Sequence, residues 1–158
     1  METETAIPWL TDAEQCAWRT YLDVNRMLMY QLEKDLQPFG LTINDYEILV
    51  NLSESAERRL RMSDLASATL QSKSRLSHQI TRMENAGLVR RENCESDRRG
   101  LYAVLTDQGM ETMHKVAPHH VESVRKHFID QLSPEALDAL HDSLKPISEQ
   151  LRGRRGKP

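Results

Sequence analysis

One short segment holds the residues of this 158-residue sequence whose types and spacing best fit a chemical role. Between positions 72 and 82, polar and basic side chains surround a few widely spaced apolar ones. Serine, lysine, arginine, histidine and glutamine donate hydrogen bonds to DNA phosphates and to base edges in the major groove. The candidate DNA contacts of this segment are Ser72, Lys73, Ser74, Arg75, Ser77, His78, Gln79 and Arg82.

These candidates divide into two expected roles. Arginine and glutamine can form paired hydrogen bonds with base edges, so we expect base contacts from Ser74, Arg75, His78 and Gln79. Ser72, Lys73 and Arg82 are expected to hold phosphates, together with the backbone amides at the start of the helix.

A second basic cluster lies at an expected turn between two short alternating segments, residues 88–93 and 101–105. Arg98 or Arg99 is the candidate for insertion into a DNA minor groove. Asp97 is expected to orient an arginine through a paired hydrogen bond. Its own negative charge does not favour contact with DNA. Arg61 and Arg90 are further candidates; Arg90 and Arg91 alternate in direction, so at most one of them should face DNA.

The positive charge is local. The whole chain has a formal net charge of −3. Residues 58–100 nevertheless contain ten basic and five acidic side chains, a net charge of +5. DNA binding needs one basic face and not a basic protein overall. The negative net charge of the chain therefore does not exclude it.

The elements that must position these residues are mostly helical. A Thr11–Glu14 capping box predicts where the first helix begins. Predicted N-cap residues of later helices are Thr42, Ser72, Thr106 and Ser133. The expected helices span residues 11–37, 41–52, 63–69, 72–86, 107–132 and 134–151. A polar connector is expected over residues 53–60, and Gly87 should end the basic helix. Leu76, Ile80 and Met83 form its predicted buried stripe.

The resulting fold class is mainly α with a small β-hairpin, the arrangement of a winged helix-turn-helix. The hairpin resembles the wing of the MarR family of bacterial transcription regulators, through Asp97, Arg99, Ala103, Leu105-Thr106 and Gly109. Ser74 to Ser77 and Arg82 to Arg91 also resemble the family's recognition helix. The resemblance covers nearly the whole chain.

This resemblance implies a single MarR-type domain over residues 1–158. Its winged helix-turn-helix lobe would span residues 41–106, and residues 11–37 and 107–151 would form dimerisation helices. The implied function is a regulator, with repression favoured, that binds a pseudo-palindromic double-stranded operator as a homodimer. A small aromatic effector is expected to release it, with Trp18, Tyr21 and Tyr46 as candidate pocket residues.

Other functional classes are alternatives to this interpretation. Cys16 is interpreted as a buried core residue, with peroxide sensing on the same scaffold as the alternative. A protein-interaction module that has lost DNA binding is a further alternative, and the basic face argues against it. Neither an enzyme motif nor a metal-ligand set is present in the sequence, so we expect no cofactor.

The expected cellular compartment follows from two features that the sequence lacks, a membrane span and a secretion signal. No uncharged apolar run approaches the ~18 residues of a membrane span. The acidic N-terminus lacks the order of a secretion signal. A cytoplasmic protein without membrane contact is therefore expected.

Overall fold

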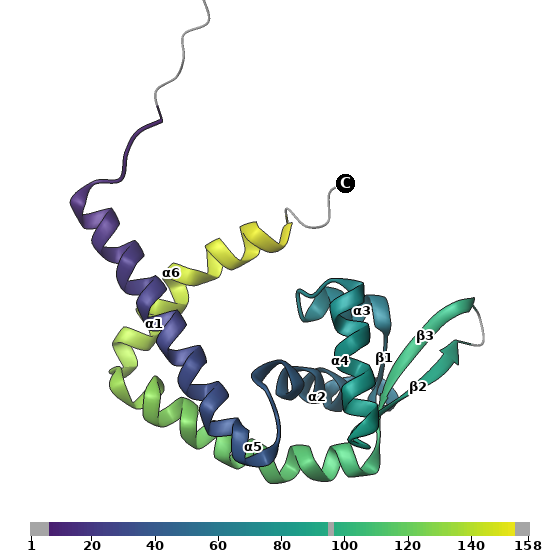
Figure 1. Ribbon diagram of the computed structural model, residues 1–158. Coiled ribbons are helices and arrows are strands. Elements are labelled where there is room, and N and C mark those ends of the chain that lie inside the picture. Colours follow the sequence, from purple (N-terminus) through teal and green to yellow (C-terminus); the bar gives the residue numbers. More distant parts are fainter. Residues whose placement is uncertain (1–6, 95–96, 154–158) are drawn as a thin grey trace, which may run out of the picture.

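The computed structural model describes residues 7–94 and 97–153, without the side chains of residues 97–99. The long helices at the two ends of the chain lie beside a small lobe that carries the sheet (Figure 1). The elements in chain order are α1 (Asp12–Leu36), η1 (Gln37–Phe39), α2 (Ile43–Glu54), η2 (Ala56–Arg58), β1 (Arg59–Arg61), α3 (Met62–Ala68), α4 (Lys73–Asn85), β2 (Val89–Cys94), β3 (Asp97–Leu105), α5 (Asp107–His127), η3 (Ile129–Gln131) and α6 (Pro134–Gly153).

Helix α1 begins at the predicted capping box. The backbone amide of Glu14 donates to the Thr11 hydroxyl at 3.3 Å, and the Glu14 carboxylate accepts from the Thr11 amide at 2.7 Å. Of its 25 residues, only Leu32 and Leu36 are buried. The first part of α1 therefore extends beyond the packed lobe (Figure 1).

The lobe is built on the core of α2, α3 and α4. Thr42 caps α2 by accepting from the Asp45 amide at 3.1 Å, as predicted. The predicted stripe of α4 is confirmed, because Leu76 and Ile80 are fully buried and Met83 nearly so. They pack with buried leucines of α2 and α3 in one cluster. This burial fixes which face of α4 is left for solvent.

The sheet has three antiparallel strands in the order β1-β3-β2. The expected hairpin is present, and its second strand begins at Asp97, earlier than predicted. Strand β1 was not predicted, since residues 53–60 were interpreted as a connector. Its three residues pair with β3 in the register Arg59 with Val104, Leu60 with Ala103 and Arg61 with Tyr102.

Helices α5 and α6 lead away from the wing and back across α1 (Figure 1). Thr106 caps α5 by accepting from the Gly109 amide at 2.9 Å. Helix α5 ends at His127, before the expected end near residue 132, and a short 3-10 turn follows. Helix α5 also lies against α1. Among the described residues, no helix combines the length and apolarity needed to cross a bilayer.

Candidate nucleic-acid interface

Helix α4 presents its polar residues on the side opposite its buried stripe. The Ser72 hydroxyl accepts from the Arg75 amide at 3.2 Å, which fixes the start of the helix. Six of the eight predicted contacts in this segment lie at the N-cap and in the first two turns of α4 and are exposed: Ser72, Lys73, Ser74, Arg75, Ser77 and His78. The first two turns of α4 thus form a continuous polar and basic surface.

The other two predicted contacts of α4 are placed differently. Gln79 is buried at 8% exposure, and its amide nitrogen donates to the Asp45 carboxylate at 3.0 Å. Its side chain therefore faces α2 and not the exposed surface where a base contact was expected. Arg82 remains 56% exposed, yet its guanidinium also donates to Asp45, at 2.6 Å. The expected phosphate contact of Arg82 thus competes with an ion pair inside the lobe.

The two adjacent arginines of β2 point in different directions, as their alternation predicts. Arg90 is 53% exposed and pairs with Glu92. Arg91 pairs with Glu84 of α4, and its guanidinium also donates to the Ser77 carbonyl at 2.8 Å and the Thr81 hydroxyl at 3.1 Å. Arg91 therefore joins the wing to α4.

Arg61 lies at the inner edge of the wing, on β1. Its guanidinium donates to the Cys94 sulfur at 3.3 Å and lies 5.8 Å from the centre of the Tyr102 ring. The guanidinium of Arg59 lies 5.0 Å from the same ring. These contacts keep basic side chains on β1 beside the hairpin.

The backbone of Asp97, Arg98 and Arg99 belongs to β3, and Cys94 pairs with Asp97 across the hairpin. The side chains of these three residues lie outside the description, so their expected roles at the wing tip stay predictions. At the other end of the hairpin, the Gln108 side chain donates to the Ala86 carbonyl at 3.2 Å. The start of α5 is thereby attached to the end of α4.

A basic-faced helix after a short turn, followed by a hairpin, is the geometry of a winged helix-turn-helix. A sequence model of the MarR family matches residues 39–100. AbsC, a MarR family regulator from Streptomyces coelicolor, is 78% identical and superposes with a TM-score of 0.89, covering 93% of this chain and 99% of AbsC. The chain belongs to the MarR family of DNA-binding transcriptional regulators.

Two further relatives support the family assignment. Sco3205, a MarR family regulator from Streptomyces coelicolor solved in complex with DNA, is 42% identical with a TM-score of 0.89. That match covers 94% of this chain and 93% of Sco3205. The regulator PecS from Dickeya dadantii is 31% identical over 112 residues, which are 70% of this chain and 65% of PecS.

The three aromatic residues predicted for a MarR-type effector pocket do not lie together. Trp18 and Tyr21 are exposed on α1, with ring centres 5.9 Å apart. Tyr46 is buried against the His120 ring, at 4.3 Å. Burial raises the pKa of Tyr46 and lowers the pKa of His120. Tyr46 is therefore placed as a core residue.

A groove separates the last turns of α6 from α2 and from the turn between α3 and α4. Its volume is about 1180 Å³, and its described lining includes Tyr21 but neither Trp18 nor Tyr46. Gln71 is among the residues that line this groove, but its amide nitrogen and oxygen are buried, and neither has a described hydrogen-bond partner. Sequence reasoning missed this position because Gln71 resembled an ordinary turn residue.

The interpretation of Cys16 as a core residue is wrong for the isolated chain. Cys16 is exposed, whereas Cys94 is buried beneath Arg61. The cause is the position of Cys16 in the first part of α1, which extends past the lobe.

Proposed function

We propose that this chain is a homodimeric repressor that binds a pseudo-palindromic operator through α4 and the wing, and that a small molecule releases it. The observation that carries the proposal is the exposed polar and basic surface on the first two turns of α4. A second support is the 42% identity to Sco3205, which was solved in complex with DNA.

Within this surface we assign two roles. We assign Ser74, Arg75 and His78 to contacts with base edges. We assign Ser72 and Lys73, at the helix start, to phosphates, together with the backbone amides there. Gln79 is left out of this set because it is buried. Arg98 or Arg99 of the wing is our proposed minor-groove contact.

The test of DNA binding uses a duplex that the wild-type protein selects from a random-sequence pool. Its affinity is measured by fluorescence anisotropy for wild type and Arg75→Ala. We expect affinity to fall by about five- to 150-fold and the preference at one position to relax, since a specific arginine contact contributes about 1–3 kcal/mol. Arg125→Ala, an exposed arginine on α5 paired with Asp130, is the matched control and should bind as wild type. Equal affinity of Arg75→Ala and wild type would contradict the assignment.

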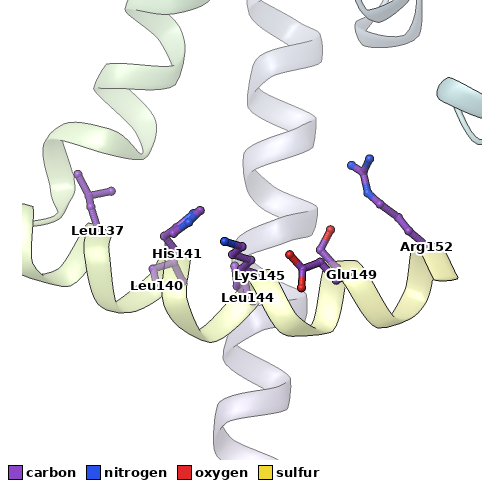
Figure 2. A pocket seen from close by; sticks show the side chains of 8 residues that line it. Leu137, Leu140, His141, Leu144, Lys145, Glu149 and Arg152 are labelled. Carbon is purple, nitrogen blue, oxygen red and sulfur yellow. The ribbon is translucent and has the colours of Figure 1, made fainter.

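The proposal of a homodimer rests on apolar surface that one chain leaves uncovered. No residue of α6 is buried. A hollow of about 550 Å³ runs along this helix and is lined by its own side chains, including Leu137, Leu140 and Leu144 (Figure 2). The exposed large apolar residues of the dimerisation helices include Trp18, Tyr21, Leu22, Val24, Met27, Met29, Tyr30, Val121, Leu144, Ile147 and Leu151. Surfaces of this kind mark protein interfaces.

Sedimentation equilibrium tests the dimer. Wild type and Asp142→Lys should sediment with twice the mass of the chain, whereas Ile147→Lys should shift the equilibrium toward monomer. Asp142 is an exposed polar residue of the same helix, so it controls for the added charge. A monomeric wild type at micromolar concentration would contradict the proposal.

The groove beside Tyr21, whose lining from α1 and α6 also belongs to the proposed dimer surface, is our proposed effector site. It combines apolar residues such as Leu144, Ile147 and Leu151 with the basic residues Lys73 and Arg152, which can pair with an acidic ligand. A thermal-shift screen of small aromatic acids should find compounds that stabilise wild type and weaken its DNA binding. Tyr21→Ala should lose this response, and Trp18→Ala serves as its control. A hit that stabilises both variants equally would place the site elsewhere.

A further inference from the structure

The carboxylate of Asp45 is buried between two helices of the DNA-binding lobe. Asp45 is 2% exposed and lies in the first turn of α2. One carboxylate oxygen accepts from Gln79 at 3.0 Å and from Arg82 at 2.6 Å. The other accepts from the Thr42 amide at 2.9 Å. A buried charge is costly unless it is paired and hydrogen-bonded, and this one is both.

Both donors come from the same side of α4. Gln79 and Arg82 are three residues apart and therefore neighbours on one helix face. Arg75 precedes Gln79 by four residues and Arg82 by seven, so it lies on the same side of the helix, one to two turns nearer its start, and is exposed there. Holding Gln79 and Arg82 on one oxygen fixes the rotation of α4 about its axis, and so fixes where the exposed side chains point.

The same network reaches α1. The Glu33 carboxylate of α1 accepts from the Ile43 amide, the first residue of α2, at 2.6 Å. The start of α2 is thus held by Glu33 on one side and holds α4 through Asp45 on the other. A hydrogen-bonded connection therefore joins α1 to the helix with the exposed basic surface.

We propose that Asp45 is a positioning residue for DNA recognition. Its carboxylate forms a clamp with Gln79 and Arg82 of α4, and Arg82 serves this clamp and not a DNA phosphate. The inference rests on the proposed DNA-binding function. Asp45 would act through α4 without touching DNA, by keeping Arg75 and its neighbours at the angle that base contacts require.

The direction in which Asp45→Asn changes DNA affinity separates this role from simple electrostatics. Asp45→Asn removes a negative charge from a lobe that binds a polyanion, so charge alone predicts equal or tighter binding. Loss of the clamp predicts weaker binding to the selected sequence. The effect should be confined to specific binding, because nonspecific binding depends on phosphates and does not need an exact helix angle.

The experiment compares wild type, Asp45→Asn, Arg82→Gln and the double variant by fluorescence anisotropy over a range of salt concentrations. The probes are the duplex selected by wild type and an unrelated duplex of equal length. Asp130→Asn, which breaks an exposed ion pair with Arg125, is the matched control. Thermal unfolding of each variant establishes that it is folded at the temperature of the assay.

The clamp predicts that Asp45→Asn and Arg82→Gln each weaken binding to the selected duplex about tenfold, a change of about 1.4 kcal/mol. Binding to the unrelated duplex should stay at the wild-type level, and the double variant should be no worse than either single one. The slope of log affinity against log salt should be unchanged in Arg82→Gln, whereas loss of a phosphate contact would lower it by about one.

Three results separate the possible failures. Wild-type or tighter binding by Asp45→Asn overturns the clamp while leaving DNA binding intact. A slope lowered by about one in Arg82→Gln reassigns that arginine to a phosphate and also overturns the clamp. If wild type selects no duplex, the proposed function itself fails. Because Arg82 is half-exposed, Arg82→Gln should fold. It therefore tests the clamp even if Asp45→Asn does not fold.

Discussion

The hydroxyl of Thr106 donates to the carbonyl oxygen of Gly87, 2.6 Å away, and so joins the start of α5 to the residue that ends α4. The same hydroxyl lies 3.0 Å from the Leu88 carbonyl and accepts from the Gly109 amide. One side chain thus connects the end of the exposed basic helix, the wing and the long helix that leads to α6. The Leu-Thr-x-x-Gly part of the family pattern has a structural basis here.

Thr106→Val should therefore destabilise the fold while keeping the shape of the side chain. It removes the helix cap and the bond to Gly87, and caps and buried hydrogen bonds each contribute about 1 kcal/mol. We expect a loss of about 1–2 kcal/mol in the free energy of unfolding by urea. Thr20→Val, at an exposed position of α1, should change stability little. Equal stability of both variants would mean that the Thr106 contacts contribute nothing.

Gly109 is required for a close approach of α5 to the wing. A Cβ atom at this position would lie 2.1 Å from the Leu88 carbonyl oxygen and 2.6 Å from a methyl carbon of Leu105. Gly109→Ala should cost about 1–3 kcal/mol or more, because α5 must move away from the strand. Gly153→Ala is the control, since nothing lies within 4 Å of its added Cβ. Thermal unfolding of both variants measures the difference, and a stable Gly109→Ala would show that the contact can relax.

Local patterns were sufficient to predict the helices and the inward face of α4. Capping residues and apolar spacing act within a few positions, so the predicted caps at Thr11, Thr42, Ser72 and Thr106 are all confirmed. Strand β1 was missed because Arg59-Leu60-Arg61 is short and basic. It forms because β3 offers a free edge, which is a tertiary cause.

The placement of individual site residues depended on partners far along the chain. Gln79 was expected on the outer face, but Asp45, 34 positions away, holds it inside. Cys16 shows the opposite case. Apolar periodicity on α1 predicts a buried face without saying whether the same chain or another one covers it, and within this chain Cys16 is exposed.

A carboxylate between α1 and α5 should make stability depend on pH. The pKa of Asp35 is lowered, chiefly by the hydrogen bond from Ser123 at 2.5 Å; burial opposes this, and Gln31 and His127 support it. A lowered pKa means that the fold favours the charged form. The stabilisation is therefore present above the ordinary pKa of 3.8 and is lost as the pH falls through the lower folded value.

Asp35→Asn should consequently be less stable than wild type at about pH 6, and the difference should shrink toward about pH 3. Urea unfolding at a fixed protein concentration measures it, because dimer formation also affects stability. Asp138→Asn, an exposed acid on α6, supplies the comparison. A difference between Asp35→Asn and wild type that stays constant over this range would rule out a contribution from Asp35 ionisation.

The central claim is that two copies of α4, one from each subunit of a dimer, bind DNA together. Hydroxyl-radical footprinting of the duplex selected by the wild-type protein tests it most directly. We predict two protected segments related by two-fold symmetry, with their centres about 10 base pairs, or one helical turn, apart. A single protected segment, or two segments without symmetry, would contradict the dimeric arrangement of the two helices.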